Sequence, residues 1–251
     1  MRKTLLGTTA SLAMIMSAHA ADLPMPQVMV YVPPAFNWTG IYIGGHVGAS
    51  TPQRAWNDTM YGADFTSGTR DVFVGGTQFG ANFQFDRFVV GIEWDLDYMK
   101  NNSNYDDGVL IPALGHRFLV SSSNHWSSSL AARFGVAFDR VLLYGKAGVG
   151  FVGNSWITIT DQTTGGTITS SNNMTTGWLA GAGVEWAFGE FINTWTMKLE
   201  YNYLGVGSWT YTVPVTAKFL AGDTFSANRD VQTLKLGFNF LFNGPNRNKY
   251  Y

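Results

Sequence analysis

Ten ionisable side chains have types and spacing that would let them act together as an electrostatic cluster. Each lies at a polar position of a segment in which apolar and polar residues alternate, so all ten share one face if these segments are strands. They are five acids, four bases and one histidine: His46, Glu93, Asp95, Asp97, Arg133, Lys146, Glu185, Lys198, Glu200 and Lys235.

This set points to electrostatics inside a barrel. If the strands enclose a narrow lumen, each charge needs a partner, because an unpaired buried charge costs several kcal/mol or is neutralised. The ten residues therefore predict a lumen filled by ion pairs. The expected centre is Glu185 and Glu200, on the sixth and seventh predicted strands, with Lys146 and Lys198 as their partners, because adjacent strands bring inward side chains within reach. A filter for ions or small solutes, built from the same charges, is the alternative.

Catalysis and metal binding are poorly matched by the remaining residues. A nucleophilic site would have to use His125 with Ser127 and Ser129, and no third group is placed to orient the histidine. Metal or haem ligation would need His46, His116 and His125 to converge, but their spacing fits no ligand motif. The chain has no cysteine. We therefore predict no enzymatic activity, no metal site and no cofactor.

The elements that position the ten side chains are predicted to be strands, because apolar residues recur at every second position. In residues 88–98 six apolar side chains alternate with a row that contains Glu93, Asp95 and Asp97. Eight segments share this pattern: 39–49, 72–85, 88–98, 127–138, 141–154, 175–188, 194–205 and 231–242. Each reaches the about 9–11 residues that a tilted strand needs to cross a bilayer. The sequence predicts an all-β fold, an eight-stranded antiparallel up-and-down transmembrane β-barrel.

The connections between these segments are of two kinds that alternate. Tight turns are predicted at residues 86, 139–140 and 189–193, and long polar loops at 50–71, 100–126, 155–174 and 206–230. Short turns on one side and long loops on the other are typical of the periplasmic and extracellular ends of a bacterial barrel.

The N-terminal residues have the features of an export signal. Arg2 and Lys3 precede an apolar stretch, and Ala18-His19-Ala20 offers a cleavage site between small residues. We divide the chain into a signal peptide (1–20), a Pro-rich periplasmic tail (21–36), an outer-membrane barrel (37–242) and a C-terminal extension (243–251). The protein is expected in the outer membrane of a Gram-negative cell envelope.

The composition fits a surface that faces lipid. Charged residues make up 13% of the chain, against about 25% in a water-soluble domain. The net charge of −1 leaves no basic excess for nucleic acid. A soluble β-sandwich is the competing fold, but it would hold its apolar residues inside, whereas here the non-apolar face is charged and Gly-rich.

Aromatic residues gather near both ends of the predicted strands. Amphipathic rings favour the headgroup level, so we expect two girdles. The girdle at the short-turn end would hold Trp38, Phe85, Phe88, Phe138, Phe188, Trp195 and Phe242. The girdle at the long-loop end would hold Phe73, Tyr98, Trp126, Phe151, Trp178 and Tyr203.

Three of the segments resemble a known family, the outer-membrane immunogenic and opacity-protein-like barrels, which share their fold with the transmembrane domain of outer membrane protein A. The similar stretches are 36–45 (FNWTGIYIGG), 177–186 (GWLAGAGVEW) and 200–203 (EYNY). The resemblance spans about residues 36–242 and is weak in the four loops. It implies an outer-membrane location and no settled activity; some relatives are described as haemin-binding and others as surface antigens.

The last strand also resembles the signal that barrel-assembly machinery recognises. Its residues are a polar position, a glycine and two alternating aromatics: Lys235, Gly237, Phe240 and Phe242. Family members usually end on the last aromatic, whereas this chain continues to Tyr251. Either the assembly machinery reads an internal signal, or the last strand runs in a different register from the one assigned here.

We therefore predict a structural surface protein that anchors extracellular loops, supports envelope integrity and contacts outer-membrane lipid and lipopolysaccharide. The alternative is a narrow solute channel or a haemin-binding surface protein. Eight strands enclose a space just wide enough for side chains, which argues against an open general pore.

Overall fold

The structure is a computed structural model that describes residues 36–52, 55–58, 60–61, 64–66, 71–103, 109–111, 114–153, 155–172, 174–188, 193–213, 222–228 and 230–242. The predicted signal peptide, the C-terminal extension and all of the predicted tail except residue 36 lie outside these residues. The described part contains fifteen strands. None of its residues form a helix long and apolar enough to cross a membrane.

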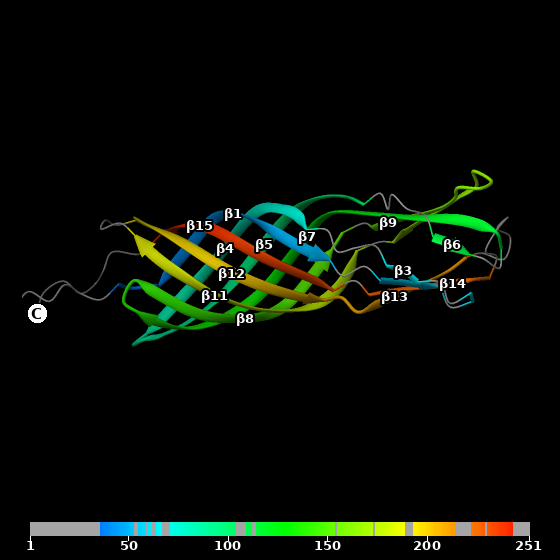
Figure 1. Cartoon of the computed structure of the whole chain (residues 1–251). Coiled ribbons are helices and arrows are strands. Elements are labelled where there is room, and N and C mark those ends of the chain that lie inside the picture. The colour runs from blue at the N-terminus through cyan, green and yellow to red at the C-terminus, as the bar shows by residue number, and fades with distance from the viewer. Residues whose placement is uncertain are drawn as a thin grey trace, which may run out of the picture. The chain divides into compact units, whose positions relative to one another are not determined.

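Eight of the strands close into an antiparallel barrel (Figure 1). They are β1 (Gly40–Pro52), β4 (Val72–Phe85), β5 (Phe88–Ser103), β7 (His116–Phe138), β8 (Val141–Val152), β11 (Thr175–Phe188), β12 (Asn193–Gly205) and β15 (Val231–Phe242). The ring runs β1-β4-β5-β7-β8-β11-β12-β15, and β15 pairs with β1 to close it. The predicted fold class is confirmed, and all eight predicted segments are strands of the barrel.

Side-chain alternation sets the two faces of the barrel. Along β8, buried and exposed residues alternate, with Tyr144 and Lys146 inside and Leu143 outside. Large apolar side chains cover the exterior on every barrel strand, for example Ile41 on β1 and Ile92 on β5. A hydrocarbon solvent favours such an exterior, whereas water would not.

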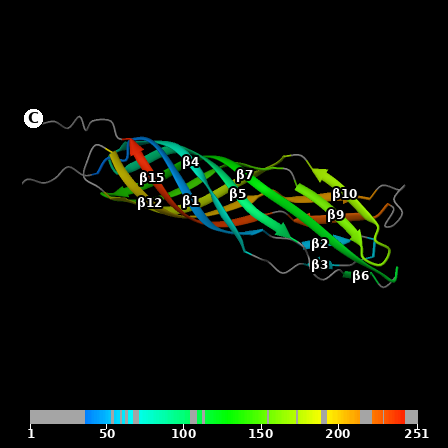
Figure 2. The same ribbon diagram turned by 90° about the horizontal axis from the view of Figure 1, so that it is seen from above.

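The predicted long loops contain further strands, which the sequence reading missed. They are β2 (Ala55–Asp58), β3 (Asp64–Thr66), β6 (Val109–Ile111), β9 (Ser155–Asp161), β10 (Thr167–Asn172), β13 (Ser208–Thr212) and β14 (Thr224–Asn228). Strands β6, β9 and β10 extend the barrel sheet along the first part of β7, while β13-β14-β2-β3 form a separate four-stranded sheet. Both views place these strands beyond one end of the barrel (Figures 1 and 2).

The described tight turns have a common conformation. Asp86 and Asp139 begin the two-residue turns β4–β5 and β7–β8, with φ angles of 53° and 52°. Aspartate tolerates this left-handed region better than most residues, and turns with positive φ match the twist of paired strands.

The lumen is packed in three layers. Near the short turns an apolar cluster contains Trp38, Val89, Ala137, Leu142, Tyr144 and Ala187. Near the long loops a second apolar region contains Ala131, Val152, Leu179, Leu204 and Val231, with Val72, Val74 and Met99 close to it along the strands. The ionisable residues occupy the middle of the strands between these regions.

Trp38 corrects the predicted girdle. Its side chain is fully buried, and its indole Nε1 donates to the backbone oxygen of Asp139 at 3.1 Å. The residue precedes β1, so strand alternation does not decide its direction, and the chain turns it into the short-turn mouth. The remaining predicted girdle residues are exposed or partly exposed.

Candidate functional site

Glu93 is the centre of the ionic layer. One of its carboxylate oxygens, Oε1, accepts from Lys146 at 2.8 Å. The other, Oε2, accepts from Lys198 at 2.8 Å and from Arg133 at 3.3 Å. All four side chains are buried. A fully desolvated carboxylate is held in its charged form only when cations and donors surround it in this way.

Lys146 forms a three-way contact. Its ammonium group lies 2.8 Å from Glu93, 2.9 Å from Asp95 and 2.7 Å from Glu200. An ammonium group has three N–H donors, and each of them has a carboxylate oxygen here. Lys198 adds a second bridge from Glu93 to Glu200, at 2.8 Å and 3.4 Å.

Arg133 links the centre to Glu185. Its Nη2 atom donates to Glu185 at 2.7 Å. The guanidinium carbon lies 3.9 Å from the ring centroid of Tyr144 and 5.5 Å from that of Tyr42. The cation is therefore held between aromatic faces, which stabilise it, and carboxylates.

The sequence predicts Lys146 and Lys198 as partners of Glu185 and Glu200. This is correct for Glu200, which lies 2.7 Å from Lys146 and 3.4 Å from Lys198, and wrong for Glu185. The cationic partner of Glu185 is Arg133. Lys198 is opposite Glu185 in the β11–β12 register, but its ammonium group reaches Glu93 and Glu200 instead. Long side chains cross a narrow lumen, so adjacency on neighbouring strands does not determine their partners.

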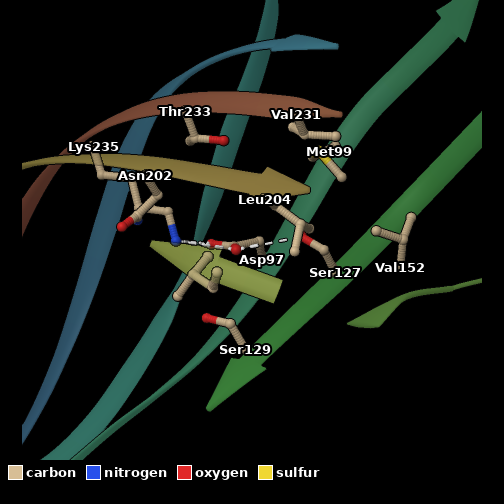
Figure 3. A pocket seen from close by; sticks show the side chains of 11 residues that line it. Asp97, Met99, Ser127, Ser129, Val152, Asn202, Leu204, Val231, Thr233 and Lys235 are labelled. Carbon is tan, nitrogen blue, oxygen red and sulfur yellow. Dashed lines mark hydrogen bonds and ion pairs between the residues drawn. The ribbon is translucent and has the colours of Figure 1, made fainter. Parts of the chain in front are cut away.

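A second group of contacts surrounds Asp97. Lys235 lies 2.8 Å from its Oδ1 atom, and Nε2 of His46 lies 2.5 Å from the same atom. Ser127 donates to Oδ2 at 3.3 Å. Figure 3 shows Lys235 and Ser127 reaching Asp97 from two sides. A cavity of about 30 Å³ lies between this group and the apolar region near the long loops.

Neutral side chains complete the layer, and the sequence reading did not select them. They are Tyr42, Gln78, Tyr144, Thr196, Asn202 and Asn239. Gln78 brings in β4, so all eight barrel strands contribute to one set of contacts. Their inward positions follow from the same alternation, but neutral groups give no charge signal that would single them out.

All ten ionisable residues singled out in the sequence are buried in the barrel. Ser127 and Ser129 are buried as well and donate to Asp97 and Asp95. Neither serine faces lipid, and the side chain of His125 lies outside the described residues. Among the described side chains, no histidine therefore lies beside Ser127 or Ser129 to form the nucleophilic site considered above.

The two histidines whose side chains the structure describes lie apart. His46 is inside the barrel, whereas Nδ1 of His116 lies 2.9 Å from Oδ2 of Asp161, on the part of β7 that extends past the barrel and pairs with β9. Ligand atoms of Glu93, Asp95 and Glu200 lie within 4.8 Å of one another, a spacing that could hold a metal ion. The ammonium group of Lys146 already bonds to all three residues.

The predicted assembly signal is divided between the two faces of β15. Lys235 and Gly237 are buried, Phe242 is exposed, and Phe240 is partly exposed. The ring centroids of Phe240 and Phe242 lie 4.8 Å apart in an edge-to-face arrangement, and those of Phe240 and Trp195 lie 5.0 Å apart.

Comparison with known proteins identifies the family. Residues 8–242 match the family model of the outer membrane protein beta-barrel domain. The chain belongs to this family. Its location is therefore the outer membrane, as the sequence predicts.

Two relatives in sequence agree with this membership. The chain is 30% identical over 239 residues to a 31 kDa outer-membrane immunogenic protein of Brucella melitensis, covering 90% of this chain and 94% of the relative. It is 30% identical over 212 residues to a 22 kDa outer membrane protein of Rhizobium leguminosarum, covering 84% and 81%. Among solved structures, outer membrane protein OprG from Pseudomonas aeruginosa is 14% identical, with a TM-score of 0.47, covering 84% of this chain and 99% of that one.

Proposed function

We propose that this outer-membrane barrel is a structural surface protein with a closed lumen and no catalytic activity. It anchors the strands and loops at its long-loop end outside the cell and supports the integrity of the envelope. Its partners in this role are outer-membrane lipid, lipopolysaccharide and, during insertion, the barrel-assembly machinery.

The observation that carries the proposal is the continuous ionic layer across the lumen. Glu93 on β5 contacts cations from β7, β8 and β12, and the neutral residues extend the contacts to the other strands. Such contacts cross-link strands that are not neighbours in the sheet. Removing one member leaves an uncompensated buried charge, so the layer resists opening.

The apolar regions above and below the ionic layer support the same proposal. Trp38 fills the short-turn mouth, and Leu179, Leu204 and Val231 lie above the ionic layer near the long loops. A hydrated path through the barrel would have to pass both apolar regions as well as the ion pairs. The lumen is therefore packed like the core of a folded domain, which suits a rigid support better than a channel.

The long-loop end supplies a surface that differs from the barrel. The four-stranded sheet β13-β14-β2-β3 and the β7-β9-β10 extension stand beyond the barrel strands. Asp230 ties the base of this region, because Tyr203 donates to its Oδ2 atom at 2.7 Å and the backbone of Val206 donates to Oδ1 at 3.1 Å. The barrel thus holds the exposed region in a fixed place.

Deletion of the gene in the native host tests the envelope role. We expect the deletion strain to admit large antibiotics and detergents more readily, and the full chain to restore the barrier. A matched variant replaces residues 208–228 by a short Gly-containing turn. It should insert normally and restore the barrier, but lose recognition by antibodies raised against the surface strands. Unchanged permeability in the deletion strain would contradict the proposal.

A further inference from the structure

His46 lies in a slot that two glycines make. In the β1 register it is opposite Gly76 on β4 and opposite Gly237 on β15. A Cβ atom at Gly76 would lie 2.7 Å from Nε2 of His46, and one at Gly237 would lie 2.9 Å from the amide nitrogen of Gln78. Larger residues at these positions would displace the ring and its partner. The fold therefore fixes the imidazole with both ring nitrogens facing defined groups.

The hydrogen bonds of Glu185 fix the direction of a chain of donors. Glu185 is paired with Arg133 and so is an acceptor. The amide nitrogen of Asn239 donates to it at 2.8 Å, which leaves Oδ1 of Asn239 to accept from the amide nitrogen of Gln78 at 2.5 Å. The oxygen of the Gln78 amide, Oε1, is an acceptor and lies 2.8 Å from Nδ1 of His46. Nδ1 must therefore carry a proton.

The opposite side of the ring faces a second acceptor. Nε2 of His46 lies 2.5 Å from Oδ1 of Asp97. Lys235 donates to both oxygens of that carboxylate, at 2.8 Å and 3.0 Å, which favours its ionised form. Two lone pairs at this distance would repel, so Nε2 also requires a proton. A ring with protons on both nitrogens is an imidazolium.

The charge count of the lumen agrees with the hydrogen bonds. The described lumen holds five carboxylates: Glu93, Asp95, Asp97, Glu185 and Glu200. It holds four permanent cations: Arg133, Lys146, Lys198 and Lys235. A charged His46 makes the two signs equal. A neutral His46 would leave one buried carboxylate uncompensated, which is the costly arrangement in a low-dielectric interior.

We propose that His46 is the fifth cation of the lumen, a doubly protonated imidazolium that links Asp97 on β5 to the Gln78–Asn239–Glu185 chain. The groups that face it are Asp97, Gln78 and, through Asp97, Lys235. This inference deepens the proposed function, because it concerns the ionic layer on which the closed lumen rests. It assigns the histidine a structural charge in place of a ligand-binding role.

Nitrogen-15 NMR of the mature barrel, labelled at histidine and refolded in lipid, tests the proposal directly. At pH 7.5 a histidine with the ordinary pKa of about 6.5 is roughly nine-tenths neutral. Each histidine ring gives two nitrogen signals, one from Nδ1 and one from Nε2. We expect one ring to show protons on both nitrogens at this pH, and His46→Gln to remove the two signals of that ring. A neutral His46 with a proton on Nδ1 alone would overturn the proposal.

Variants of the pair give an independent readout. His46→Gln should lower the urea midpoint of unfolding, and adding Asp97→Asn should recover most of that loss because it restores equal numbers of charges. His116→Gln, which removes a histidine from a pair outside the barrel, should leave the midpoint unchanged. If the double variant is less stable than the unmutated barrel by the sum of the two single-variant losses, the proposal is contradicted. If His46→Gln does not refold, His116→Gln and His125→Gln assign the NMR signals of His46 by elimination, and the protonation of its two nitrogens decides.

The two proposals can fail separately. A neutral His46 in a barrel that does not conduct ions would overturn this inference and leave the proposed function standing. An imidazolium in a barrel that conducts steadily would support the inference and contradict the closed lumen.

Discussion

The Nζ atom of Lys146 on β8 lies 2.7 Å from Oε1 of Glu200 on β12, although β11 separates the two strands in the sheet. The lysine side chain therefore crosses part of the lumen to reach its partner. We expect Lys146→Met and Glu200→Gln each to destabilise the barrel by about 3–5 kcal/mol, as removal of one partner of a buried pair does. The double variant should show a coupling energy of about 0.5–3 kcal/mol in urea unfolding from lipid vesicles.

The matched control for this cycle is Lys146→Met with Glu185→Gln. Glu185 bonds to Arg133, and among the described residues no hydrogen bond or ion pair joins it to Lys146, so the coupling should be clearly smaller. Equal coupling in the two cycles would show that the stability of the barrel depends only on the total charge of the lumen and not on the specific contacts.

Trp38 should contribute strongly to the stability of the barrel, although it lies outside the strands, before β1. Trp38→Ala removes a fully buried indole from the short-turn cluster, and such truncations cost about 3–5 kcal/mol. Trp195→Ala is the control, because Trp195 is 51% exposed on the exterior. Urea unfolding should separate the two variants. Comparable small losses would mean that Trp38 does not fill the mouth of the barrel in the membrane.

Depth in the membrane should decide the cost of a charge on the exterior of β11. Val184 is level with Leu143 and Leu199 in the strand register, whereas Trp178 contacts Tyr203 near the long-loop end. We expect Val184→Arg to cost about 2–4 kcal/mol and Trp178→Arg about 0–1 kcal/mol. Vesicle refolding titrations measure both. The lipid-facing assignment of this row fails if neither variant has an effect.

Asp161 makes the turn between β9 and β10 sensitive to acid. Desolvation raises its pKa, but hydrogen bonds from the Thr164 hydroxyl, from the backbone of Thr163 and Thr164 and from His116 outweigh this and lower the pKa below the ordinary value. A carboxylate with a lowered folded-state pKa stabilises the turn above the unfolded-state pKa, and the contribution is lost as pH falls through the folded-state value.

Amide hydrogen exchange at Thr163 and Thr164 measures this effect. Protection should persist at neutral pH and disappear only below the usual aspartate range, about pH 3.9. In Asp161→Asn the protection should be weak at every pH. Loss of protection well above the usual aspartate range in the unmutated chain would contradict the role given to the Asp161 carboxylate.

Much of the fold was predictable because the bilayer simplifies the pattern. Lipid requires apolar residues on one whole face, so alternation alone located the strands, and β4, β11 and β15 begin and end where the sequence predicts. Outside the membrane this constraint disappears. The polar residues that extend β7 back to His116, and the sheet formed with β13 and β14, carry no comparable signal.

The site shows the same division. The ten ionisable residues could be placed on the inner face, because alternation fixes the face of each residue. Their partners could be assigned only in part: Lys146 and Lys198 are correct for Glu200 and wrong for Glu185. A lysine can reach strands that are not its neighbours, so adjacency on the sheet does not decide its partners. Trp38 was misplaced for a related reason: it lies before the first paired residue of β1, where the alternation rule does not apply.

The central claim is that the lumen is closed by its ionic and apolar layers, and planar-bilayer conductance of the refolded mature barrel tests it most directly. A porin of 16–18 strands serves as the positive control, because its lumen is an aqueous channel. We expect the barrel to insert, as folding-dependent gel mobility would show, and to give no steady conductance steps at neutral pH. Large, stable currents from correctly folded barrels would contradict the account and favour a solute channel.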